Sequence, residues 1–219
     1  MLLTDGLYWY REHSPFGDCN TYLFEDEFLV MFDPGNPRYL EDRLKEIERD
    51  ELNPHKIKII ANTHCHPDHS GANSAFQKIT GAEIQAASAE MEYVEKYRST
   101  GIFGKDYESF DAKLLGEVIQ AGRTTIEVLD TPGHSPGSVC FHCPAKKFLI
   151  TGDLAFYGGI GRTDLPGGSL TKLQRSLESI SKRKTSLFLP GHGDIIEGWD
   201  RIRDNFEVIK NRLPWFVVE

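Results

Sequence analysis

Four apolar runs in this chain have the length of a β-strand, and each leads directly into a short segment that carries histidine or aspartate. The runs cover residues 57–61, 125–129, 148–150 and 186–189, and the segments after them contain His69, His134, Asp153 and His192. Loops that leave the carboxyl ends of strands in one sheet gather at one edge of that sheet, where α/β folds place their sites. The pattern therefore predicts that distant parts of the chain meet at one polar site.

The remaining pattern predicts an α/β (α+β) fold in which sheets carry helices on their outer faces. Further runs of strand length and composition cover 21–24, 28–32, 83–87 and 139–142. Apolar stripes with helical spacing lie at 40–47, 170–180 and 202–209, and Ser169 is predicted to cap the second of these helices. No repeat, linker or low-complexity tract interrupts the chain, so we expect a single domain over residues 1–219.

Composition limits the partners and the location that we expect. The formal net charge of -8 provides no basic stripe for phosphate contacts, so we expect no nucleic-acid partner. Asp5 interrupts the amino terminus before an apolar stretch of signal length can form, and no run is long enough to span a bilayer. We therefore expect a cytoplasmic protein without a membrane partner.

The four cysteines are too few and too scattered for a disulfide framework, and we expect reduced thiols. Cys140 and Cys143 form a C-x-x-C pair, but the surrounding residues predict a strand. Residues three apart on a strand point to opposite faces, which argues against a chelating or redox pair. Cys65 lies between His64 and His66. If these two histidines point toward a metal, the residue between them points away from it, so we interpret Cys65 as a structural residue.

Seven residues offer side chains of the kind that hold transition metals. They are His64, His66, Asp68, His69, His134, Asp153 and His192. Each alone could be an ordinary loop residue, and the segment 63–69 alone could be a solvated polar loop. Together, five imidazoles and two carboxylates suit zinc, iron or manganese better than calcium or magnesium. Seven ligands exceed what one ion needs, whereas two adjacent divalent ions that share a carboxylate would use them all.

The motif His-x-His-x-Asp-His at 64–69, followed in order by His134, Asp153 and His192, resembles the metallo-β-lactamase superfamily over nearly the whole chain. The resemblance implies a four-layer αββα sandwich. It also implies that His64, His66 and His134 hold one metal, that Asp68, His69 and His192 hold the other, and that Asp153 bridges them. Asp33 matches a family aspartate that orients ligands from behind, although an Asp-Pro-Gly turn explains it equally well.

Two such ions would provide a hydroxide nucleophile and polarise a carbonyl, so no serine or cysteine nucleophile is needed. Asp68 is the predicted catalytic residue, since it can align the hydroxide as well as bind metal. A thiolate leaving group needs little help from a general acid because a thiol has a pKa near ~8.5. We therefore expect a metal-dependent hydrolase acting on a small thioester.

The segment from Phe156 to Gly168 resembles both short glyoxalase II-like thioester hydrolases and persulfide dioxygenases. In both, the arginine that matches Arg162 lies near the thiol-derived substrate, where a guanidinium can pair with a carboxylate. The alternative for Arg162 is a turn contact with Asp164. A dioxygenase would use a single iron held by His64, His134 and Asp153, leaving the other ligands idle.

Other functions fit the sequence less well. Lactonases share the ligand motif, whereas true β-lactamases are secreted and match poorly. A non-catalytic metal site is usually a closed set of four ligands, often rich in cysteine, which this set is not. The apolar segment Trp215-Phe216-Val217-Val218 suggests a contact with another subunit, so a homo-oligomer stays open.

Overall fold

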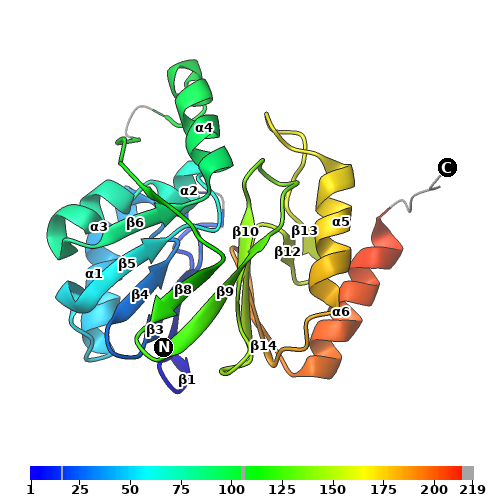
Figure 1. Cartoon of the computed structure of the whole chain (residues 1–219), viewed down its shortest axis with the longest axis horizontal. Coiled ribbons are helices and arrows are strands. Elements are labelled where there is room, and N and C mark those ends of the chain that lie inside the picture. The colour runs from blue at the N-terminus through cyan, green and yellow to red at the C-terminus, as the bar shows by residue number, and fades with distance from the viewer. Residues whose placement is uncertain (16, 105–106, 214–219) are drawn as a thin grey trace.

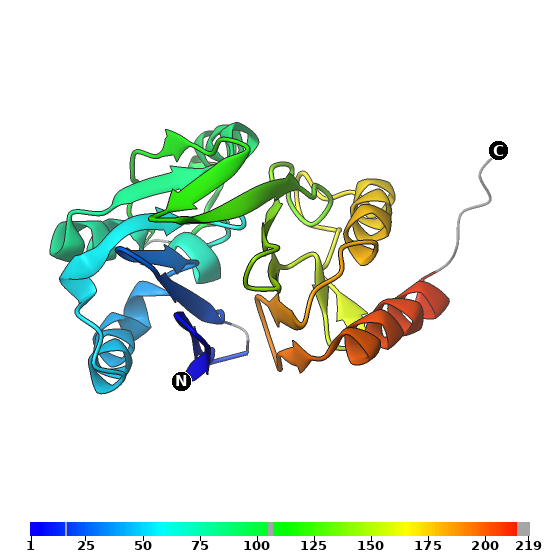
Figure 2. The same ribbon diagram turned by 60° about the horizontal axis from the view of Figure 1, so that its bottom comes forward.

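Two β-sheets lie face to face at the centre of the molecule, and helices cover the outer face of each (Figure 1). The computed structural model describes residues 1–15, 17–104 and 107–213. The first half of the chain builds one sheet with α1 and α3, and the second half builds the other with α5 and α6. Figure 2 shows these halves side by side, with the blue-to-cyan helices on one flank and the yellow-to-red helices on the other.

The first sheet has seven strands in chain order. They are β1 (Leu2–Thr4), β2 (Leu7–Tyr10), β3 (Thr21–Glu25), β4 (Leu29–Phe32), β5 (Ile57–Ala61), β6 (Glu83–Ala86) and β7 (Lys113–Leu114). The strands from β4 to β7 run parallel, so the carboxyl ends of β4 and β5 meet at the same edge. The helical elements of this half are η1 (Pro37–Tyr39), α1 (Leu40–Arg49), η2 (Pro54–Lys56), α2 (Pro67–Ser70), α3 (Asn73–Thr80), α4 (Ser88–Tyr97) and η3 (Arg98–Thr100).

The second sheet has six strands in the order β15-β14-β11-β10-β9-β8. They are β8 (Val118–Ala121), β9 (Thr124–Asp130), β10 (Val139–Cys143), β11 (Phe148–Gly152), β14 (Leu187–Pro190) and β15 (Ile196–Glu197). Because β10 is antiparallel to both β9 and β11, and β14 is parallel to β11, the strands β9, β11 and β14 share one direction. The small hairpin β12 (Ala155–Phe156) and β13 (Gly159–Ile160) follows, and α5 (Leu170–Ser181) and α6 (Trp199–Arg212) complete the half.

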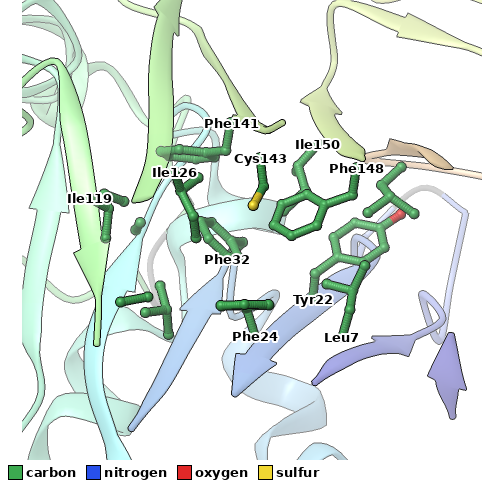
Figure 3. Close-up of a cluster of buried hydrophobic side chains, with 14 of the residues drawn as sticks. Leu7, Tyr22, Phe24, Phe32, Ile119, Ile126, Phe141, Cys143, Phe148 and Ile150 are labelled. Atoms are coloured by element: carbon green, nitrogen blue, oxygen red, sulfur yellow. The ribbon is translucent and has the colours of Figure 1, made fainter. Parts of the chain in front are cut away.

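The main apolar core fills the space between the two sheets (Figure 3). Phe32 and Phe141 meet from opposite sheets with ring centroids 4.8 Å apart, and Phe24 meets Phe148 at 5.6 Å. Burial of one such side chain is worth about 1.5–3 kcal/mol, so this layer provides much of the stability that holds the two halves together.

Separate apolar clusters attach the helices to the outer faces of the sheets. Ile47 of α1 and Phe76 of α3 pack on Leu23 and Ile60 of the first sheet. In the second half, Leu177 of α5 and Phe206 of α6 pack against that sheet. These three interlayer cores confirm the four-layer αββα sandwich.

The two cysteines of the C-x-x-C pair separate as predicted. Cys140 belongs to the cluster beneath α5 and α6, whereas Cys143 belongs to the cluster between the sheets. All four cysteines are buried free thiols. The pair is therefore a packing feature of β10.

The predicted strands and the three predicted helices all form, and Ser169 caps α5 by accepting a hydrogen bond from the backbone of Lys172. The helices α2, α3 and α4 were not predicted, and neither were the strands β1, β2, β7, β8, β12, β13 and β15. Among the residues that the structure describes, no helix is long and apolar enough to cross a bilayer. The segment 215–218 lies outside the described residues.

Candidate metal centre

The seven predicted ligands gather at one edge of the sandwich, where the four strands named at the outset end. The loop after β5 carries His64, His66, Asp68 and His69, whereas His134, Asp153 and His192 follow β9, β11 and β14. Both halves of the chain therefore contribute to the same site. Three ligand groups within this set have donor atoms close enough to hold an ion. Two of them share no residue and are described below, and the third combines His64 of one group, His69 of the other and Asp153.

The first group consists of three buried imidazoles, those of His64, His66 and His134. The Nε2 atom of His134 lies 2.8 Å from Nδ1 of His66 and 3.2 Å from Nε2 of His64. Asp153 Oδ2 approaches the same His134 nitrogen to 3.5 Å. Three nitrogens and one carboxylate oxygen thus surround one position, as a four-coordinate transition-metal site requires.

The second group consists of Asp68, His69 and His192. The Nε2 atoms of the two histidines lie 3.3 Å apart, and Asp68 Oδ2 lies 3.4 Å from Nε2 of His192. Asp153 reaches this group with its other oxygen, Oδ1, at 3.2 Å from His69 and 3.6 Å from His192. Asp153 therefore faces one group with each carboxylate oxygen.

A cation fits both positions because donor atoms there face each other. His134 donates Nδ1–H to the carbonyl of Arg162 at 2.8 Å, which leaves a lone pair on Nε2. His64 donates to Thr63 Oγ1, whose own proton goes to Asp33, so Nε2 of His64 also carries a lone pair. Asp153 Oδ1 is buried and has no hydrogen-bond partner among the described residues. Facing lone pairs and an unpartnered buried carboxylate oxygen require a positive charge between them.

Asp33 supports both groups from behind. Its Oδ2 atom accepts hydrogen bonds from Thr63 Oγ1 at 2.6 Å and from His69 Nδ1 at 2.9 Å, and its Oδ1 atom accepts from the Thr63 backbone at 2.8 Å. Asp33 adopts a left-handed backbone conformation with φ 51°, which is strained for a residue with a side chain. Asp33 therefore adopts a turn conformation and also contacts the predicted ligands, so both interpretations of this residue apply.

Two residues in the surroundings of the centre were not predicted from the sequence. Glu12 accepts hydrogen bonds from His192 Nδ1 at 2.7 Å and from the Gly193 backbone at 3.0 Å. Glu90 of α4 is buried and accepts from the backbones of Cys65 and Gly137 and from Ser135 Oγ. Neither glutamate lies in a recognisable motif, and no local signal identifies them.

Glycines permit the close approach of the loops to the centre. A Cβ atom on Gly191 would lie 2.4 Å from Asp153 Oδ1 and 2.7 Å from Cε1 of His69. Gly152 has φ 48°, and a Cβ atom there would lie 2.4 Å from Thr63 Oγ1. Only glycine fits these two positions without moving the ligands.

The two groups differ in charge. Burial, together with the neighbouring histidines, holds the pKa of His64 well below its usual value, and burial lowers the pKa of His66 to about 4. Burial also acts to lower the pKa of His192, but the carboxylates around it outweigh burial and raise that pKa to about 10. His64 and His66 of the first group are thus neutral imidazoles, whereas His192 of the second group attracts a cation strongly, whether proton or metal.

Arg162 and Cys65 lie at the margin of the site. The Arg162 guanidinium forms two hydrogen bonds with Asp164, at 2.9 and 2.6 Å, and both side chains are exposed. Cys65 is fully buried and packs with Tyr93 and Phe103, away from the facing nitrogens. The turn contact of Arg162 exists in this structure, and a role in substrate binding requires the guanidinium to leave Asp164.

The profile of the metallo-beta-lactamase superfamily matches residues 14–192, a span that includes all seven predicted ligands. The chain belongs to the metallo-β-lactamase superfamily. The superfamily binds divalent metals, which agrees with the facing donor atoms. The sheets and helices described above are those of its fold.

Relatives within the superfamily are moderately similar. The chain is 31% identical over 186 residues to hydroxyacylglutathione hydrolase GloC of Haemophilus influenzae, with 82% of each chain covered. It is 28% identical over 185 residues to a probable metallo-hydrolase of Methanocaldococcus jannaschii, covering 80% of this chain and 88% of that one.

Solved structures of the same superfamily superpose well. The BLEG-1 B3 metallo-beta-lactamase is 28% identical with a TM-score of 0.73, covering 87% of this chain and 93% of that one. The protein TTHA1623, solved in a di-iron-bound form, is 28% identical with a TM-score of 0.71, covering 85% and 92%.

Proposed function

We propose that this protein, a metallo-hydrolase of the metallo-β-lactamase superfamily, uses two divalent metal ions to hydrolyse a small thioester. The observation that carries the proposal is the position of Asp153, whose two carboxylate oxygens face two separate ligand groups. The hydroxyacylglutathione hydrolase GloC, at 31% identity, supports a thioester as the substrate class. The two ions are zinc or iron, with manganese as a further candidate, and the di-iron relative supports iron.

When bound, two ions at these positions supply a hydroxide nucleophile at neutral pH and polarise the substrate carbonyl. Asp153 and the five imidazoles would hold the two ions. Asp68 is 29% exposed, so its carboxylate can also meet a water molecule and hold it in line with the carbonyl. A thiolate leaves without a protein acid because its conjugate thiol has a pKa near ~8.5.

The main alternative is a persulfide dioxygenase with a single iron held by His64, His134 and Asp153. Asp68, His69 and His192 would then be idle, yet His69 and His192 each donate a hydrogen bond to a buried carboxylate that orients Nε2 toward the centre. Such support is expected for ligands in use. We therefore favour the hydrolase.

One paired assay tests the reaction class. Thioester hydrolysis and persulfide-dependent oxygen uptake are measured on the same anaerobically prepared sample, whose metal content is quantified. We expect thioester hydrolysis with two metal equivalents per chain. Oxygen uptake with one iron would replace the proposal with the dioxygenase, and hydrolysis of a lactone or β-lactam alone would change the substrate class.

The variant His69→Ala tests the second metal position. We expect it to lose most of one metal equivalent and most hydrolysis, because only this imidazole reaches both Asp33 and Asp153 within the second group. Unchanged metal content and activity would contradict the two-metal centre.

A further inference from the structure

Glu12 contacts the centre from a segment that the motif residues do not include. It follows β2, and its carboxylate is 8% exposed. One oxygen accepts from Nδ1 of His192 at 2.7 Å, and the other accepts from the backbone N–H of Gly193 at 3.0 Å. A carboxylate that accepts the Nδ1 proton fixes the imidazole so that Nε2 is the atom that faces the metal position.

Glu12 and Asp33 contact different predicted ligands. Asp33 contacts His69 directly and His64 through Thr63, so it supports one ligand of each group. Among the seven predicted ligands, Glu12 contacts only His192, which belongs to the second group. Removal of the two carboxylates should therefore have different effects on the two metal positions.

Hydrogen bonds with buried side chains hold the backbone of Arg11, Glu12 and Cys19. Asn20 Oδ1 accepts from the Glu12 backbone at 3.1 Å, and Asn20 Nδ2 donates to the carbonyl of Gly193 at 2.9 Å. The guanidinium of Arg43 is buried and donates to the carbonyls of Arg11 and Cys19. These contacts tie the backbone of Glu12 to the loop that carries His192 and Gly193, so the fold sets the position of the carboxylate.

We propose that Glu12 is a positioning residue that sets the affinity of the metal position formed by Asp68, His69 and His192, while leaving the position formed by His64, His66 and His134 unaffected. The inference rests on the proposed two-metal function. Loss of a partner behind a metal-binding histidine typically lowers metal affinity about 10–100-fold. We expect that loss at one position only.

The test is a competitive Zn²⁺ titration of the metal-free full-length protein against a chelator, with metal content measured after dialysis. In Glu12→Ala, we expect the dissociation constant of one equivalent to rise about 10–100-fold and that of the other to stay at the wild-type value. Glu12→Gln keeps one acceptor for His192 and should give an intermediate constant. Asp33→Ala should weaken both equivalents.

A double-mutant comparison assigns the affected position. If Glu12 acts through His192, then adding Glu12→Ala to His192→Ala should change the remaining metal constant no further. Asp194→Asn is the matched control, because Asp194 lies on the same loop and pairs with Arg11 in an exposed contact at 3.0 Å. It should leave both constants unchanged.

Three results would overturn the inference. If Glu12→Ala keeps both wild-type dissociation constants, Glu12 has no effect on metal affinity. If Glu12→Ala weakens both equivalents equally, the effect is not selective for one position. If Glu12→Ala fails to fold, as judged by thermal unfolding, Glu12→Gln decides in the same way. If the wild-type protein binds only one equivalent of Zn²⁺, the proposed two-metal function itself is wrong. The titration of the wild type shows this before any variant is compared.

Discussion

His134 donates its Nδ1–H to the backbone carbonyl of Arg162 across 2.8 Å, while the side chain of Arg162 pairs with Asp164. The backbone of Arg162 therefore orients a predicted metal ligand, and the side chain of Arg162 takes no part in that contact. The two roles can be separated by substitution, because alanine keeps the carbonyl and removes the guanidinium.

Arg162→Ala should leave the metal content unchanged and raise KM for an anionic thiol-derived thioester more than for a neutral one. The guanidinium would leave Asp164 to pair with a carboxylate of the substrate, an interaction that a neutral substrate lacks. Steady-state kinetics on a matched pair of substrates measures this. Equal effects on both substrates would assign Arg162 to the turn alone.

Glu90→Ala should lower the free energy of unfolding by about 3 kcal/mol, since it leaves several buried donors without their acceptor. These donors are the backbone N–H groups of Cys65 and Gly137 and the Ser135 hydroxyl. Glu95, exposed on the same helix, provides the control. Glu95→Ala should change stability by less than about 0.5 kcal/mol in the same denaturant titration.

Tyr93→Phe should leave the free energy of unfolding unchanged or raise it by up to about 1 kcal/mol. The Tyr93 hydroxyl is buried without a hydrogen-bond partner among the described residues, so its removal exposes no group. Tyr22 is the matched control, because its buried hydroxyl donates to the Pro190 carbonyl at 2.8 Å. Tyr22→Phe should cost about 1 kcal/mol, and equal losses in both variants would contradict the difference.

The metal-free protein should lose stability between neutral pH and pH 10. Burial lowers the pKa of His192, but Asp153, Asp68 and Glu12 raise it to about 10, above the ordinary value near ~6.5. Protonated His192 therefore contributes stability that is fully present below about pH 6.5 and is lost as pH rises through about 10.

Thermal unfolding in the presence of a chelator measures this pH dependence. His192→Gln should flatten the slope because glutamine does not titrate. The metal-loaded protein should lack this part of the slope as well, since the metal replaces the proton. Identical slopes for the wild type and His192→Gln would show that another group is responsible.

The strands that position the ligands could be predicted because each is a short apolar run that ends at a polar turn. The helices α1, α5 and α6 could be predicted from their apolar stripes. By contrast, α4 buries Glu90, Tyr93 and Val94 rather than a regular aliphatic stripe, so its sequence lacks a clear helical period. The two-residue strands β7, β12, β13 and β15 are too short to leave a pattern.

The partners behind the ligands could be predicted only in part. Asp33 directly follows a strand, which gives it the same local signature as the ligands. Glu12 lies 180 residues from His192, and Glu90 lies 45 residues from Ser135, so only the folded chain brings them together. A hydrogen bond between residues so distant leaves no trace in one sequence.

The donor atoms of the centre are divided between the two halves of the sandwich. A chain cut at residues 115–117, between β7 and β8, would leave His64, His66, Asp68 and His69 on one fragment and His134, Asp153 and His192 on the other. Neither fragment would hold a full set for either position, because His134 completes the first and His192 the second. Metal uptake by a mixture of the two fragments would therefore show, without any substrate, that the two halves had associated as in the native fold.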